Sequence, residues 1–293
     1  MENCMKRMKN LIIFTFSLLF ILSFLINKDI IANHSTSIKP NFYDASRIIE
    51  FSDQKWLVES YMDEKVYPGP NYFSSSEDHV WIDQRGFLTL NIQQNPSGKW
   101  MSSSVKSLKP AQYGIHRFRV IGNIEKMDKN TVLGLFMYRI DPNFPDKRAE
   151  VDIEFSTWGL PYETNEGTIK AKTNGHYTLW NPWNDGETPK PHSVESFWVR
   201  MPRGTHTMHE IIWTENKIEF NSYHGHAVNN PNRVVINQFT IVNDENKDPI
   251  IPHENDNMHI MLNFWIHGYN SAPYEDNNHQ MKIKYEFEPI YDF

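Results

Sequence analysis

Apolar and polar residues alternate along this chain in short runs. Five runs place apolar side chains at every second position, at residues 87–92, 115–120, 151–155, 217–220 and 281–287. A period of two is that of a β-strand with one buried face. Turn-forming residues separate the runs, as at 95–98, 184–186 and 229–232. Many short strands between such turns predict an antiparallel β-sandwich or barrel.

The remaining pattern supports a single all-β domain. From Phe51 to Phe293 no helical period is sustained over three turns, and no repeat of fixed length is present. Solenoids and propellers are therefore disfavoured. We predict one domain at residues 53–293, an antiparallel sandwich of two packed sheets, preceded by a short polar lead segment at 33–52.

The N-terminus has the pattern of an export signal. Three basic residues, Lys6, Arg7 and Lys9, precede an apolar run from Leu11 to Ile26. A basic segment followed by an apolar one is typical of a secretory signal peptide, predicted here at residues 1–32. Residues 30–32 form a poor cleavage site, so an uncleaved membrane anchor is the alternative. Either case predicts a secreted or extracytoplasmic domain that contacts the membrane only through this segment.

Composition excludes several classes of function. The chain has 293 residues, one cysteine and a formal net charge of −7. One cysteine excludes a disulfide framework, a four-cysteine zinc site and an iron–sulfur cluster. The negative charge argues against a nucleic-acid partner, because such binding depends on neutralising phosphates. No G-x-S-x-G, Walker A or dinucleotide motif occurs. We therefore expect no cofactor and no metal in the site, and a monomer.

Candidate chemistry lies on the strand predicted at 151–155. Glu150, Asp152 and Glu154 share one face of this strand, and Val151, Ile153 and Phe155 share the other. The apolar face suits a core. Three carboxylates in a row on the other face repel one another, and this energetic cost indicates that they have a function.

Glycoside hydrolysis is one such function. Retaining enzymes place two carboxyl groups about 5–5.5 Å apart, one as nucleophile and one as acid/base. Two glutamates four positions apart on a curved sheet can lean toward each other, and an aspartate between them can share a proton with the nucleophile. The structural alternative is a solvated edge strand carrying ordinary surface acids.

Five ordered segments resemble glycoside hydrolase family 16, the family of lichenases, laminarinases and xyloglucan transglycosylases. The strand Glu150–Phe155 is similar to the family's active-site strand, in the regular spacing without the extra bulge residue. The other four segments are similar to its YGxxExR strand, the strand before the active-site strand, a later hairpin and its MNLW strand; they lie at 113–119, 134–138, 206–220 and 261–265.

The resemblance implies a fold and a set of roles. It implies a concanavalin A-like β-jelly-roll with a substrate cleft across the concave sheet. By position, Glu150 is the nucleophile, Asp152 the assisting carboxylate and Glu154 the general acid/base. The positions that match cleft-lining residues of the family are Phe136, Tyr138, Asn263 and Trp265. Family members often hold a structural calcium, for which no loop here identifies the ligands.

Departures from the family pattern bear on the substrate. Arg117 stands where the family usually has Glu, and Arg148 where lichenase-like members have Trp. Lys170 and Lys172 replace sugar-contacting residues if the segment 169–175 aligns with the family's FNYYTNG stretch. These cations, if they line the cleft, predict an anionic glycan; otherwise they pair with the acids or the alignment slips.

Trp180 and Trp183 lie among turn residues at 177–184 and suggest a glycan platform or a lid. A loop folded back on the core is the alternative. Trp158, just past the acidic strand, has the same two interpretations. By contrast, Trp213 and Phe220 are expected in the core, and His206 and His209 on opposite faces of one strand.

Together these observations predict an exported, retaining endo-β-glycoside hydrolase acting on a polysaccharide of the β-glucan or galactan type. Two alternatives stay open. One is a jelly-roll protein that binds carbohydrate without cleaving it, and the other is a transglycosylase that uses the same residues.

Overall fold

The computed structural model describes residues 46–61, 64–139, 149–161, 171–180, 191–202, 204–247, 250–268, 272–275 and 279–290. Within these residues strands dominate, and the helices are the short 3-10 turns η1 (Ile124–Lys126) and η2 (Glu254–Asp256). The predicted signal or anchor at 1–32 lies outside the described residues. No helix in the described part is long and apolar enough to cross a membrane.

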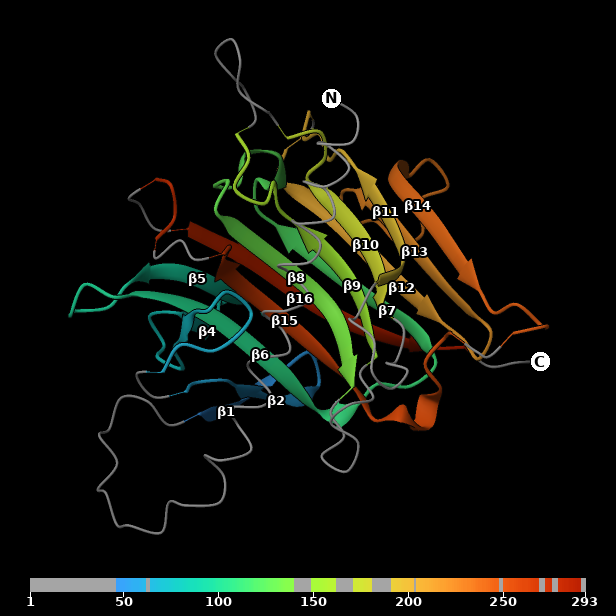
Figure 1. Ribbon diagram of the computed structural model, residues 1–293, viewed down its shortest axis with the longest axis horizontal. Coiled ribbons are helices and arrows are strands. Elements are labelled where there is room, and N and C mark those ends of the chain that lie inside the picture. Colours follow the sequence, from blue (N-terminus) through green and yellow to red (C-terminus); the bar gives the residue numbers. More distant parts are fainter. Residues whose placement is uncertain are drawn as a thin grey trace, which may run out of the picture.

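One group of strands forms the inner sheet. Its order is β11 (Pro191–Phe197), β10 (Gly175–Trp180), β9 (Glu150–Phe155), β8 (Thr131–Arg139), β15 (Met258–Ile266), β6 (Trp100–Pro110), β2 (Gln54–Val58) and β1 (Arg47–Phe51). All these pairings are antiparallel. In Figure 1, β9 lies beside β8 in the middle of this sheet.

The other group forms the outer sheet. Its order is β14 (Val234–Val242), β13 (Lys217–His224), β12 (His206–Trp213), β7 (Gly114–Ile121), β16 (His279–Pro289), β5 (Leu88–Gln94) and β4 (Val80–Ile82). The two sheets join where β5 pairs with β6, and the short strand β3 (Tyr72–Phe73) runs parallel to β6. The two-sheet, antiparallel all-β prediction is confirmed.

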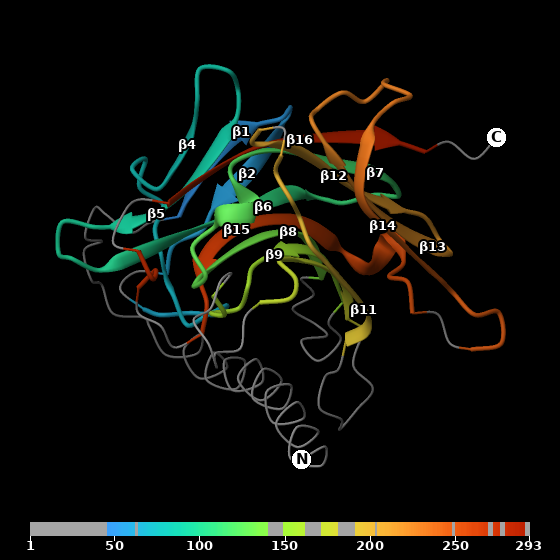
Figure 2. The same cartoon turned by 90° about the horizontal axis from the view of Figure 1, so that it is seen from above.

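Seen from above, β15, β8 and β9 form a curved layer, and β16, β7 and β12 lie on one side of it, toward the top of the view (Figure 2). We call the face of the inner sheet that points away from the outer sheet its concave face. The position of every functional side chain follows from which residues of an inner strand point to this face and which point between the sheets.

The core fills the space between the sheets, as the alternation predicts. Val151, Ile153 and Phe155 of β9 are fully buried there. Trp213 and Phe220 of the outer sheet are also fully buried, which confirms their predicted core placement. Because neighbours on a strand point to opposite faces, Glu150, Asp152 and Glu154 are directed to the concave face.

The domain begins earlier than predicted. Residues 47–51, placed in the polar lead segment from sequence, form strand β1 and pair with β2. Trp56 of β2 is fully buried, donates its indole N–H to the Phe51 carbonyl at 2.8 Å and contacts the Phe51 ring. Burial of these two aromatic rings keeps the segment in the sheet, so the boundary at residue 53 is corrected to residue 47 or earlier.

Arg117 lies on the far side of the outer sheet. Its neighbours on β7, His116 and Phe118, point into the core, so Arg117 points away from both the core and the inner sheet. Its Nε donates to Oε1 of Glu210 at 2.7 Å, and its other nitrogens lie 3.3 Å from Glu288 and 3.7 Å from Glu286. Arg117 is therefore part of an ion-pair cluster in which Arg117 and Glu210 are buried, while Glu286 and Glu288 reach the solvent.

We expect Arg117→Ala to lower the free energy of unfolding by about 3 kcal/mol, because it leaves Glu210 buried without its partner. Arg119→Ala is the matched control, since Arg119 is partly exposed and pairs with Glu286 alone. It should cost less than about 1 kcal/mol. Urea unfolding of both variants checks this, and equal losses would contradict the structural role of Arg117.

Candidate active site

The candidate site is built around three carboxyl groups on the concave face of β9. The strand is flanked by β8 and β10, whose directly opposed residues share its concave face. Glu150 lies between Tyr138 and Trp180, Asp152 between Phe136 and Thr178, and Glu154 between Gly134 and His176. We call Glu150, Asp152 and Glu154 the carboxylate row.

Asp152, in the middle of the row, is an acid with a raised pKa. Its side chain is buried, with the residue 3% exposed. Burial and the negative charges of Glu150 and Glu154 raise the pKa of Asp152 well above its ordinary value. Oδ2 accepts the Trp180 indole N–H at 2.8 Å, and the carboxyl is also hydrogen-bonded to Glu150. In its protonated form Asp152 donates to Glu150 and so orients that carboxylate.

Glu154 carries a proton at neutral pH. Burial, and secondarily the charge of Glu150, raises its pKa from 4.5 to about 8. Glu154 is therefore an acid with a proton to donate at pH 7, whereas an ordinary glutamate is ionised. The influence of Glu150 on this pKa places the two carboxyl groups within electrostatic reach of each other.

Gly134 makes room beside Glu154. A Cβ at this position would lie 2.3 Å from Oδ1 of Asn263, which comes from the neighbouring strand β15. The missing side chain of Gly134 therefore lets the Asn263 amide reach over β8 toward the carboxylate row. Every other residue type has a Cβ, which would fill this space.

The predicted binding residues on β8 and β15 do gather on this face. Phe136 and Asn263 are buried, Tyr138 is partly exposed, and Trp265 packs in a small apolar cluster with Phe73 and Val132. Within the described residues, Oδ1 of Asn263 and Nε1 of Trp265 are buried without a hydrogen-bond partner. Buried polar atoms normally have partners, so these two suit a hydroxyl-bearing ligand.

Farther across the concave face lies a carboxylate that the sequence analysis did not single out. Glu59, next to the end of β2, is buried and accepts a hydrogen bond from Ser104 of β6 at 2.7 Å. Its other oxygen accepts from the Tyr61 hydroxyl at 3.2 Å. Ser104 opposes Asn263 in the sheet, so a continuous polar row links Glu59 to the carboxylate row.

Strand β10 corrects the predicted loop at 177–184. Residues Tyr177–Trp180 are strand, with Tyr177 buried in the core and Trp180 bonded to the carboxylate row. His176, which opposes Glu154, was missed. Its signal is the alternation of His176, Thr178 and Trp180, hidden by turn-type residues at 174–175 and 181–182. Trp183 lies outside the described residues.

The two predicted cations that lie in the described part of the structure are not near the carboxylate row. Arg117, expected to bind substrate, belongs to the outer sheet and is separated from the concave face by the core, which corrects that expectation. Lys172 is exposed ahead of β10, which pairs with β9 from Gly175 onward. Arg148 and Lys170 lie outside the described residues.

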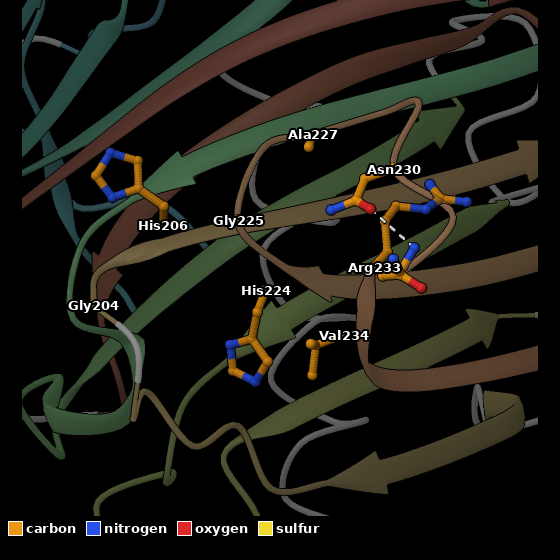
Figure 3. Close-up of a pocket in the computed structure, with 9 residues that line it drawn as sticks. Gly204, His206, His224, Gly225, Ala227, Asn230, Arg233 and Val234 are labelled. Atoms are coloured by element: carbon orange, nitrogen blue, oxygen red, sulfur yellow. Dashed lines mark hydrogen bonds between the residues drawn. The ribbon is translucent and has the colours of Figure 1, made fainter.

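A hollow elsewhere lacks the chemistry of the carboxylate row. It measures about 310 Å³ and lies at the end of the outer sheet, lined by His206, His224 and Arg233 among others. Figure 3 shows the two imidazoles on neighbouring strands and Arg233 in the loop that follows. No Asp or Glu lines it. Among the described residues no group of three or more His, Cys, Asp or Glu is arranged to hold a metal ion.

The raised pKa of Glu154 makes stability depend on pH. Between its unfolded value near 4.5 and its folded value of about 8, the folded protein holds a proton that the unfolded chain has released. The free energy of unfolding therefore falls as pH rises through this range. Glu154→Gln removes the effect, so its stability relative to wild type should increase from pH 5 to pH 8 by about 2 kcal/mol or more.

Urea unfolding at the two pH values measures this difference. Glu219→Gln is the control, because hydrogen bonding to Asn221 lowers the pKa of Glu219 and leaves it ionised across the range. The control should show a constant difference from wild type. A constant difference for Glu154→Gln as well would mean that Glu154 is ionised at neutral pH.

The sequence matches no protein-family model and no curated protein sequence. The structure is similar to a β-1,3-1,4-glucanase (lichenase) derived from a mouse hindgut metagenome, at 17% identity and a TM-score of 0.53, covering 82% of this chain and 96% of that chain. It is also similar to a glycoside hydrolase family 16 endo-glucanase from Bacteroides ovatus, at 14% identity and a TM-score of 0.55, covering 78% and 92%.

A third similar structure is an immunostimulatory antigen and pseudo β-1,3-glucanase of Mycobacterium tuberculosis, at 15% identity and a TM-score of 0.53, covering 78% of this chain and 88% of that chain. Identities this low show the fold and not the activity. The chain has the β-jelly-roll fold of the glycoside hydrolase family 16 enzymes.

Proposed function

We propose that the protein is an exported, retaining endo-β-glycoside hydrolase that cleaves a polysaccharide of the β-glucan or galactan type. The observation that carries the proposal is the arrangement of the carboxylate row. Glu154, whose pKa is raised to about 8, stands two positions from Asp152, whose pKa is also raised and whose carboxyl is hydrogen-bonded to Glu150. The apolar signal pattern at residues 11–26 supports export.

The proposed reaction uses two displacements at the anomeric carbon. Glu150 attacks this carbon while Glu154 donates its proton to the departing glycosidic oxygen, which forms a covalent glycosyl-enzyme. Water then attacks the same carbon, Glu154 takes the proton of that water, and the Glu150–sugar bond breaks. Two inversions give net retention. Asp152 orients Glu150 and keeps its negative charge in place through the shared proton.

The surroundings of the row suit a neutral glycan better than an anionic one. The described cations that suggested an anionic substrate, Arg117 and Lys172, lie away from the carboxylate row. Aromatic and amide groups line the face instead, at Phe136, Tyr138, Asn263 and Trp265. Aromatic faces with a few fixed polar groups suit stacking on neutral sugar rings.

A non-catalytic carbohydrate-binding protein is the second candidate. One structure of similar fold is described as a pseudo β-1,3-glucanase, so the fold alone does not guarantee turnover. A protein that only binds sugars has no use for three neighbouring carboxyl groups, two of them with raised pKa values, which favours the enzyme. Transglycosylation by the same residues differs only in which acceptor reaches the glycosyl-enzyme.

Glu150→Gln should reduce turnover at least about 10³-fold, because the amide cannot act as nucleophile. Reducing ends released from a panel of neutral β-glucans, galactans and sulfated polysaccharides measure activity, and NMR of early products gives the anomeric outcome. Glu219→Gln, on the outer sheet, is the control and should cleave at the wild-type rate.

Retained cleavage by Glu150→Gln with an unchanged circular dichroism spectrum would refute the assignment. Saccharide binding without any product from wild type would favour the non-catalytic candidate. Products elongated in the presence of oligosaccharide acceptors would point to transglycosylation.

The rate should also fall on the alkaline side near pH 8. Glu154 is active as an acid only while protonated, so kcat/KM should decline as its pKa of about 8 is passed. A profile of kcat/KM from pH 5 to pH 10 on a cleaved polysaccharide checks this. A profile that declines already below pH 6 would show that the general acid is not Glu154 in this state.

A further inference from the structure

Trp158 has an unusual backbone conformation beside the carboxylate row. Its φ of 54° lies in the left-handed region, which a bulky side chain rarely adopts. Neighbouring contacts hold it there: its N–H donates to Ser156 Oγ at 2.9 Å, and its ring packs against Trp265 and His267. Backbone strain of this kind persists where the side chain has a specific task.

The indole N–H of Trp158 caps one nitrogen of His176. Nε1 of Trp158 lies 3.0 Å from Nε2 of His176. Indole is only a donor, so Nε2 must accept and the ring proton must sit on Nδ1, which donates to Ser196 Oγ at 3.0 Å. The carbonyl oxygen of Ser156 lies 3.3 Å from Nε2, a longer contact. A proton on Nε2 would serve the Ser156 carbonyl instead, but the shorter contact with Trp158 favours a neutral His176 with its proton on Nδ1.

This imidazole is the direct neighbour of Glu154. The two residues oppose each other on β10 and β9, where paired side chains have Cβ atoms about 4.5–5.5 Å apart. Next to Glu154, an imidazole with an open lone pair could take the Glu154 proton, because attraction between the imidazolium and the carboxylate raises the pKa of the one and lowers the pKa of the other. Glu154 would then have no proton to donate when substrate binds.

We propose that Trp158 is a positioning residue that keeps the lone pair of His176 occupied, so that the reactive proton stays on Glu154. The proposal rests on the proposed function of Glu154 as general acid. In agreement with it, burial lowers the pKa of His176 to about 4, while Glu154 titrates at about 8. The proposal concerns one proton, which resides either on Glu154 or on His176, and no other bond forms or breaks.

Few other titratable groups face this pair in the described part of the structure. On β9 they are Glu150 and Asp152, and at the end of β15 His267 touches the Trp158 ring. The opposing positions on β8, β11 and β15 are Gly134, Ser196 and Asn263, which do not titrate. A change in the pKa of His176 can therefore be measured with little interference from other titrating groups.

The direct test is an NMR titration of the histidine side chains in ¹⁵N-labelled protein. In wild type, His176 should stay in the Nδ1–H tautomer from pH 5 to pH 8. In Trp158→Phe, which keeps an aromatic ring but removes the N–H, its pKa should rise by about one pH unit or more. Trp81→Phe, on the outer-sheet strand β4, is the matched control and should leave His176 unchanged.

Two results would overturn the proposal. One is a wild-type His176 that is charged or in the Nε2–H tautomer at neutral pH, which needs no variant to be folded. The other is an unchanged His176 titration in a folded Trp158→Phe protein. Neither result depends on turnover, so a wild type that cleaves no glycan would defeat the proposed function and leave this inference to be decided by the titration.

A kinetic cycle separates positioning from simple support of the fold. Trp158→Phe should move the alkaline limb of kcat/KM to lower pH, because the proton shifts from Glu154 to His176. In the His176→Gln background, where no imidazole can take the proton, adding Trp158→Phe should leave the limb in place. A purely structural role would lower the rate without moving the limb in either background, and that outcome would contradict the proposal.

Discussion

Three carboxyl groups at every second position of one partly buried strand face repel one another strongly when ionised, and the surroundings of this site follow from that constraint. Placing three negative charges together in a medium of low polarity costs far more than leaving two of them protonated. The pKa values of Asp152 and Glu154 are raised accordingly. The indole of Trp180, the open space at Gly134 and the neutral ring of His176 all fit this arrangement, since none of them brings a positive charge to the row.

The fold supplies the constraint through the geometry of a packed sheet. The apolar half of β9 must point between the sheets, because Val151, Ile153 and Phe155 are buried there. The same alternation then obliges the acids to share the concave face. The charged residues around Arg117 pair with one another on the outer sheet, away from the carboxylate row. The core therefore separates the ion-pair cluster on the outer sheet from the carboxylate row on the inner sheet.

Much of this could be predicted from the sequence, and the failures have physical causes. The alternation of the six residues of β9 predicts its acidic and apolar faces. The sequence also predicts the core positions of Trp213 and Phe220. Arg117 was misplaced because alternation shows that a side chain leaves the core but not which of the two sheets carries its strand. His176 was missed because turn-type residues flank a strand of six residues. The contact between Trp158 and His176 joins residues 18 positions apart through a left-handed backbone that no local pattern reveals.

The central claim is that Glu154 carries a proton at neutral pH beside a second acid, Asp152, whose pKa is well above its ordinary value. A titration of ¹³C-labelled carboxyl groups by NMR, with the three resonances assigned by Glu150→Gln, Asp152→Asn and Glu154→Gln, tests it most directly. The account predicts that at pH 7 the Glu154 carbon has the chemical shift of a protonated acid and titrates at about 8, and that the Asp152 carbon titrates well above the ordinary range of an aspartate. If all three carbons have ionised shifts at pH 7 and titrate below pH 5, the account is wrong.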